Sequence, residues 1–157
     1  MKGLLLFFVL CLLPDSSLAR AAVSLPVARH LTLDCVAVAA LAHDVPLAAL
    51  MGILAVEGGK VGEAVCNANG SWDLGPFQVN TCNLNELAVL GLSPEAILRD
   101  GCANARAAAW ILSREYARAG NLWTAIGAYH SRTPQYRDAY AARVKTHLER
   151  MRYGVRP

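Results

Sequence analysis

One turn-rich stretch, residues 60–82, interrupts an otherwise helical sequence, and this interruption most limits the folds open to the chain. Asn67, Gly70 and Pro76 disfavour helix there, whereas Trp72 and Val79 favour short extended pieces. Helices are expected on either side, over 31–43, 46–57, 83–90, 103–119, 121–130 and 134–153, with a further one starting near residue 94. The pattern predicts an α+β domain, mainly α, with a small hairpin or irregular sheet.

Length and charge narrow the classes of protein. The 157 residues are enough for one domain, and 55% hydrophobic against 17% charged residues exclude an intrinsically disordered chain. The formal net charge of +3 is lower than the concentrated positive charge typical of nucleic-acid-binding proteins, so we expect no nucleic-acid partner. It does suit a polyanion such as a cell-wall polymer. The last helix is strongly charged, so we expect it to present a solvated face.

The first residues are typical of a secretory signal peptide. Lys2 precedes an apolar run over 3–13, which is shorter than the about 20 residues of a membrane-spanning helix, and small residues follow. We expect residues 1–19 to be the signal peptide, with cleavage after Ala19 or Ala21. Residues 20–157 would then form a single domain, exported to the periplasm as a monomer with no membrane anchor.

Two carboxylates lie close to the turn-rich stretch. Glu57 ends an apolar helix, and both an apolar setting and the negative end of the helix dipole raise a carboxyl pKa, as a general acid requires. The alternative is an exposed glutamate that merely ends a helix. Asp73 follows in the expected hairpin. Paired carboxylates are the basis of glycoside hydrolysis, although a turn aspartate more often bonds its own backbone.

Several separated motifs occur in one order: Glu57 at a helix end, the run NGSWDLGPFQVN over 69–80, the segment 100–104, and Gly127-Ala128-Tyr129-His130. Together, over about residues 34–145, they resemble the lysozyme-like lytic transglycosylases. The resemblance is strongest to the small exported enzymes that accompany conjugation, type IV secretion and related envelope machines.

The resemblance implies roles for individual residues. Glu57 would be the catalytic acid and base, and the Tyr129 hydroxyl would orient Glu57 or the acetamido group of the sugar. The sugar-binding residues would be Gln78, Phe77, Asn80, Trp72 and His130. Gly58 stands where the family usually has serine, and His130 stands where it usually has an amide.

The implied reaction is cleavage of the β-1,4 bond between N-acetylmuramic acid and N-acetylglucosamine of peptidoglycan, closing a 1,6-anhydro ring. No metal or organic cofactor is implied. The biological role would be local opening of the wall for a secretion, conjugation or pilus apparatus. Two alternatives stay open: a hydrolytic muramidase that uses Glu57 and Asp73, and a wall-binding assembly factor whose catalysis has decayed.

Four cysteines remain after Cys11 is removed with the signal peptide. An even number in an exported chain indicates two disulfides, and the lack of a C-x-x-C pair disfavours a zinc site. Of the three possible pairings, we expect Cys66–Cys82, because these residues flank the hairpin. Cys35–Cys102 would then tie the first helix to the long one.

Overall fold

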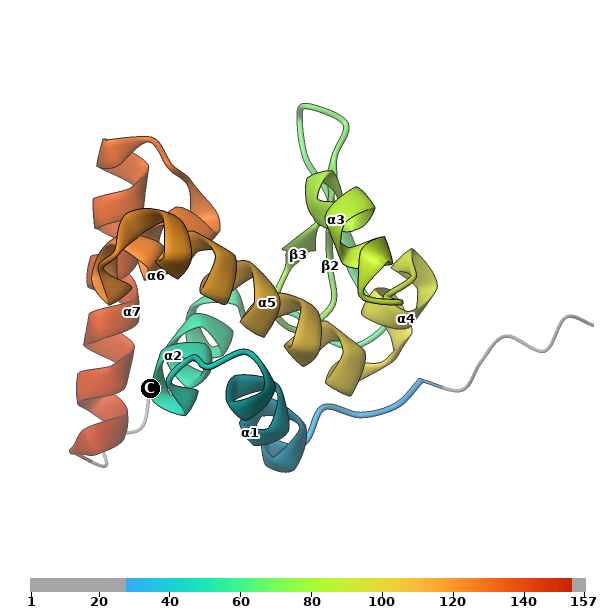
Figure 1. The fold of residues 1–157 in the computed structure, drawn as a ribbon, viewed down its shortest axis with the longest axis horizontal. Helices are drawn as coiled ribbons and strands as arrows, with labels where there is room; N and C mark the ends of the chain where they lie inside the picture. The colour runs from blue at the N-terminus through green and yellow to red at the C-terminus, as the bar shows by residue number, and fades with distance from the viewer. Residues whose placement is uncertain (1–27, 154–157) are drawn as a thin grey trace, which may run out of the picture.

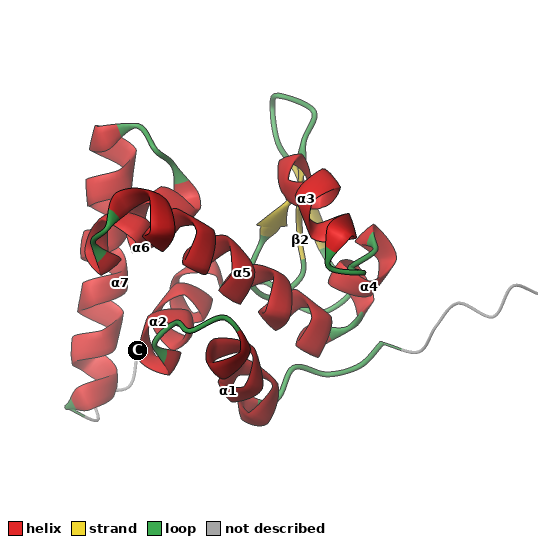
Figure 2. Ribbon diagram, viewed as in Figure 1, coloured by secondary structure: helices red, strands yellow, loops and turns green. Residues whose placement is uncertain are grey.

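The computed structural model describes residues 28–153 and is mainly helical, with one small antiparallel sheet (Figure 1, Figure 2). The signal peptide expected over 1–19 lies outside the described residues. The helices are α1 (Leu33–Ala42), α2 (Leu47–Glu57), η1 (Thr81–Asn83), α3 (Leu84–Val89), α4 (Pro94–Arg99), α5 (Gly101–Ala119), α6 (Leu122–His130) and α7 (Pro134–Arg152). Where the sequence analysis expected both ends of an α-helix, the observed ends lie within two residues of them, and the helix expected near residue 94 begins at Pro94. The mainly α, α+β prediction is confirmed.

The sheet occupies the turn-rich stretch, as expected. Its strands are β1 (Ala64–Cys66), β2 (Trp72–Leu74) and β3 (Val79–Asn80), in the order β1-β2-β3. Asp73 pairs with Val65 on one side and with Asn80 on the other. The sheet, α3 and α4 lie beside the N-terminal part of the long α5 (Figure 1). Helices α6 and α7 lie near the C-terminal end of α5. Among residues 28–153, no helix is both long and apolar enough to cross a membrane.

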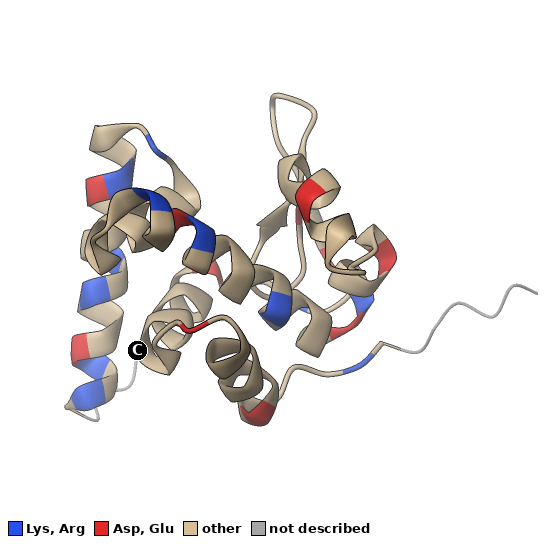
Figure 3. Cartoon of the chain, in the orientation of Figure 1, with Lys and Arg blue, Asp and Glu red and all other residues tan. Residues whose placement is uncertain are grey.

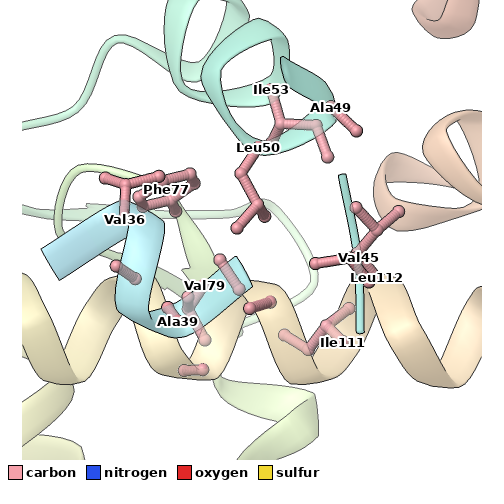
Figure 4. Packing of buried hydrophobic residues seen from close by; sticks show 14 of the residues in the cluster. Val36, Ala39, Val45, Ala49, Leu50, Ile53, Phe77, Val79, Ile111 and Leu112 are labelled. Carbon is pink, nitrogen blue, oxygen red and sulfur yellow. The ribbon is translucent and has the colours of Figure 1, made fainter. Parts of the chain in front are cut away.

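A buried side chain of the sheet region anchors it to the helices. Phe77 is 0% exposed and lies with Val79 among side chains of α1, α2 and α5 (Figure 4). The buried Asn104 on α5 makes two hydrogen bonds to the same turn and a third to α4. Its amide nitrogen donates to the carbonyls of Leu74 (2.8 Å) and Ile97 (2.9 Å), and its oxygen accepts from the Phe77 N–H at 2.9 Å.

The last helix is not simply a solvated face. Tyr140 and Val144 of α7 are buried, and Leu148 is partly buried against the same core. These positions follow an i, i+4 spacing, which places them on one side of the helix, while the charged residues occupy the remainder. The charged residues Asp138, Arg143 and Lys145 are exposed as expected, and the sequence analysis missed only the apolar stripe on the opposite side.

One of the two expected disulfides is confirmed. Cys35 on α1 is bonded to Cys102 on α5, with a Cα–Cα distance of 4.9 Å. The Cys66–Cys82 prediction is wrong, because both residues are free and exposed. Cys66 ends β1 and Cys82 follows β3, so the central strand β2 separates them. Two strand spacings amount to about 9.5 Å, more than the about 7 Å that a disulfide can span between Cα atoms.

We expect the double variant Cys35→Ser/Cys102→Ser to lose about 4 kcal/mol of unfolding free energy, because a cross-link over 67 residues restricts the unfolded chain. Urea denaturation under non-reducing conditions measures the loss. The matched control is Cys66→Ser/Cys82→Ser, which removes two exposed free thiols and should leave the midpoint unchanged. A similar loss in both double variants would contradict the observed pairing.

Candidate active site

A cavity of about 1070 Å³ lies between the sheet and the helices α5 and α6. It brings together six of the residues singled out in the sequence: Glu57, Asp73, Gln78, Asn80, Tyr129 and His130. They come from α2, β2, the turn before β3, β3 itself, and the end of α6. The two carboxylates suggested by the sequence therefore share one cavity.

Glu57 is placed by the close approach of two backbone segments. It is the last residue of α2, which Gly58 ends in the left-handed conformation. The next residue, Gly59, donates its N–H to the carbonyl of Pro76 at 3.2 Å. A Cβ at Gly59 would overlap the Gly75 carbonyl oxygen and the Gln78 side chain, so only glycine allows this contact. The contact fixes Glu57 beside the turn that carries Gln78.

A residue that sequence reasoning missed holds Glu57. The hydroxyl of Tyr140, on α7, donates to Glu57 Oε1 at 2.6 Å. Burial and the neighbouring Glu57 charge raise the pKa of Tyr140, so the hydroxyl keeps its proton and acts as a donor. Tyr129, which the resemblance suggested for this role, donates instead to the carbonyl of Phe77 at 2.8 Å. Only the i, i+4 stripe of α7 marked Tyr140 as inward-facing in the sequence.

The electrostatic setting of Glu57 suits an acid. Burial raises its pKa above the ordinary value, and the nearby charge of Asp73 raises it further. The Tyr140 hydrogen bond and the Arg143 charge act in the opposite direction but do not outweigh burial. Glu57 therefore retains a proton to higher pH than an exposed glutamate. The alternative of an exposed glutamate that merely ends a helix is excluded.

Asp73 has a different, polar environment. Its Oδ1 accepts from the Asn80 amide at 2.7 Å, and its Oδ2 accepts from the Asn67 amide at 2.9 Å. It therefore bonds side chains from either side rather than its own backbone, and Asn67 joins the site as a residue the sequence did not single out. The two carboxylates of the cavity therefore have different surroundings: Glu57 ends an apolar helix, whereas amide groups hold both oxygens of Asp73.

Two of the expected sugar contacts do not lie in the cavity. The prediction that the Phe77 ring contacts sugar is wrong, because this ring is fully buried in the core. Only the backbone carbonyl of Phe77 contacts a site residue, Tyr129. Trp72 is 45% exposed but precedes Asp73 in β2, and successive side chains of a strand point to opposite faces. Gln78 does line the cavity, with its amide donating to the Gly75 carbonyl at 2.8 Å.

A third carboxylate in the cavity wall, that of Glu115, forms ion pairs with three arginines. Glu115 on α5 is 3% exposed, and its Oε1 lies 2.8–3.1 Å from guanidinium nitrogens of Arg114, Arg118 and Arg132. Figure 3 shows acidic and basic positions next to one another along the ribbon of α5. Burial alone would raise the pKa of Glu115, but the bonds and charges of Arg132 and Arg114 outweigh it and lower the pKa. Glu115 thus stays ionised and serves structure.

A second cavity, of about 580 Å³, lies beside the disulfide between α1 and α5. Its Asp100 caps α5 by accepting from the backbone of Cys102 and Ala103, so that carboxylate has a structural task. Within residues 28–153, no group of three or more histidine, cysteine or acidic side chains is placed to hold a metal ion.

A mainly helical domain whose small sheet shares a cavity with a half-buried glutamate at a helix end is of the lysozyme-like class. The chain belongs to the Transglycosylase SLT domain family, which matches residues 34–147. It is 34% identical to Invasion protein IagB of Salmonella typhimurium over 84 residues, 54% of this chain and 51% of that protein. It is 37% identical to X polypeptide of Escherichia coli over 76 residues, 45% of each. The chain thus spans about half the length of the curated relatives it matches.

Proposed function

We propose that the chain is a peptidoglycan lytic transglycosylase that cleaves the β-1,4 bond between N-acetylmuramic acid and N-acetylglucosamine. The observation that carries this proposal is the half-buried Glu57, which accepts a hydrogen bond from Tyr140 in a cavity of about 1070 Å³. Membership of the transglycosylase family supports the same reaction class.

The proposed mechanism uses one residue as acid and then as base. Because the Tyr140 hydroxyl donates a hydrogen bond to Glu57 Oε1, the proton that Glu57 transfers would be on Oε2. Glu57 protonates the glycosidic oxygen, the bond from that oxygen to C1 of the muramyl sugar breaks, and the sugar's own acetamido group stabilises the cationic centre. The Glu57 carboxylate then accepts the proton of the 6-hydroxyl as its oxygen bonds to C1. This closes the 1,6-anhydro ring and returns Glu57 to its acid form.

Asp73 favours one alternative, a hydrolytic muramidase. It is a second carboxylate in the cavity of Glu57, a pairing that glycoside hydrolysis uses, and water would then be the acceptor. Asp73→Asn separates the two reactions. In the transglycosylase we expect a mild loss, because the acetamido group stabilises the cation. In the muramidase the loss would approach that of removing Glu57.

Mass spectrometry of the fragments released from purified peptidoglycan tests the proposal. We expect products lighter by one water than the hydrolytic ones. Fully hydrated products would replace the transglycosylase with the muramidase. Binding to peptidoglycan with no release of fragments would favour instead the wall-binding assembly factor.

We further infer an exported protein that acts in the periplasm as a monomer and opens the wall locally for a secretion, conjugation or pilus apparatus. The signal-like residues 1–19 and the envelope location of the substrate support export. One relative is named as an invasion protein, which is compatible with an apparatus of this kind. N-terminal sequencing of the secreted form should begin at Arg20 or Ala22, and an uncleaved start at Met1 would contradict the export proposal.

A further inference from the structure

His130 ends α6 at the edge of the cavity, and its ring lies flat on that of Tyr140. The ring centroids are 4.9 Å apart and the ring planes are inclined by only 4°. Tyr140 is the residue whose hydroxyl contacts Glu57 Oε1 at 2.6 Å. His130 is exposed to solvent, whereas Tyr140 beneath it is 2% exposed. The imidazole of His130 therefore lies between the Tyr140 ring and solvent.

The packing of α6 on α7 imposes this arrangement. Gly127 lies one turn before His130, and a Cβ there would overlap the backbone of Arg137, which lies one turn before Tyr140. The two helices therefore touch at backbone level at this point. On the same Tyr140 ring, the Arg143 guanidinium carbon lies 6.0 Å from the centroid. His130 makes the closer contact, at 4.9 Å between ring centroids.

We propose that His130 is a positioning residue: its flat ring holds the Tyr140 ring, and with it the hydroxyl that orients Glu57. The resemblance gave His130 a place among the sugar contacts, and the geometry gives it a partner in the protein. The imidazole acts through its shape, so neither its charge nor its N–H groups are needed. The effect on turnover rests on the proposed function, whereas the contact itself does not.

Kinetics on soluble peptidoglycan oligomers test the role in turnover. An aromatic pair biases a ring's position by a factor of roughly three to ten, so His130→Ala should lower kcat by up to about tenfold with little change in KM. His130→Phe keeps a flat ring without charge and should stay within about twofold of wild type. His30→Ala, at an exposed histidine before α1, is the matched control and should behave as wild type. Wild-type kcat in His130→Ala, or an equal loss in His130→Phe, would overturn the proposal.

A carboxyl titration tests the contact without turnover. The Tyr140 hydrogen bond lowers the pKa of Glu57, so Tyr140→Phe should raise that pKa, as read by the carbon-13 shift of the Glu57 carboxyl. In the His130→Ala background the same substitution should raise the pKa by clearly less than in wild type, because the hydroxyl contacts Glu57 for a smaller fraction of the time. In the His130→Phe background it should act as in wild type. Equal shifts in all three backgrounds would overturn the proposal even if no peptidoglycan-cleaving activity were found.

Discussion

Glu57→Gln should fold normally and release peptidoglycan fragments about 10³-fold more slowly than wild type, because general acid–base catalysis commonly contributes 10²–10⁴-fold. Glutamine keeps the size of the side chain and an oxygen that can accept from Tyr140, but its amide is not acidic and cannot protonate the glycosidic oxygen. Fragment release followed by mass spectrometry measures the loss. Turnover close to wild type would remove Glu57 from the mechanism.

The same variant should be no less stable, which separates loss of chemistry from loss of fold. Folding raises the pKa of Glu57 by burial, so ionisation of this group favours the unfolded chain. This cost is absent below the ordinary value of 4.5 and grows as pH rises through the folded-state pKa. Glu57→Gln removes the cost, so its Tm should equal or exceed that of wild type at about pH 7, with any gain vanishing near about pH 4. A markedly lower Tm at neutral pH would point to a structural role.

The sequence predicted features that depend on neighbours in the chain. The α2 end at Glu57, the position of the sheet and the limits of α5 follow from apolar spacing, glycine and proline, and these act over a few residues. Family motifs then added which of these residues share a cavity. Six of the eight proposed site residues line it, although none of the motifs describes how their side chains bond.

The errors concern contacts between distant parts of the chain. Tyr140 reaches Glu57 across 83 positions, and its short apolar stripe was hidden among charged residues. Phe77 sits in a turn, where no strand or helix period tells which side its ring faces, and packing turned it inward. Cys66 and Cys82 flank the hairpin along the chain, but a third strand makes β2 central and keeps them apart. Each of these outcomes is decided by tertiary packing.

Asn104→Ala should be the most damaging single change to the fold outside the cavity, costing about 4 kcal/mol of unfolding free energy. It removes one side chain and strands three buried backbone groups: the Phe77 N–H and the carbonyls of Leu74 and Ile97. Each buried polar group left without a partner costs about 1–3 kcal/mol, and partial relaxation reduces the sum. Chemical denaturation measures the loss. Asn85→Ala, at an exposed asparagine on α3, is the matched control and should cost little.

The same variant should lose activity at temperatures where it is still folded. The turn that Asn104 holds carries Gln78 into the cavity, and its Phe77 carbonyl accepts the Tyr129 hydroxyl. The Pro76 carbonyl of that turn also receives the Gly59 N–H, two residues after Glu57. Loosening the turn therefore displaces both walls of the cavity at once, and the rate of fragment release should fall by about tenfold or more, as expected when reacting groups lose alignment. An Asn104→Ala protein that is destabilised yet fully active well below its Tm would show that α5 supports the fold without positioning the site.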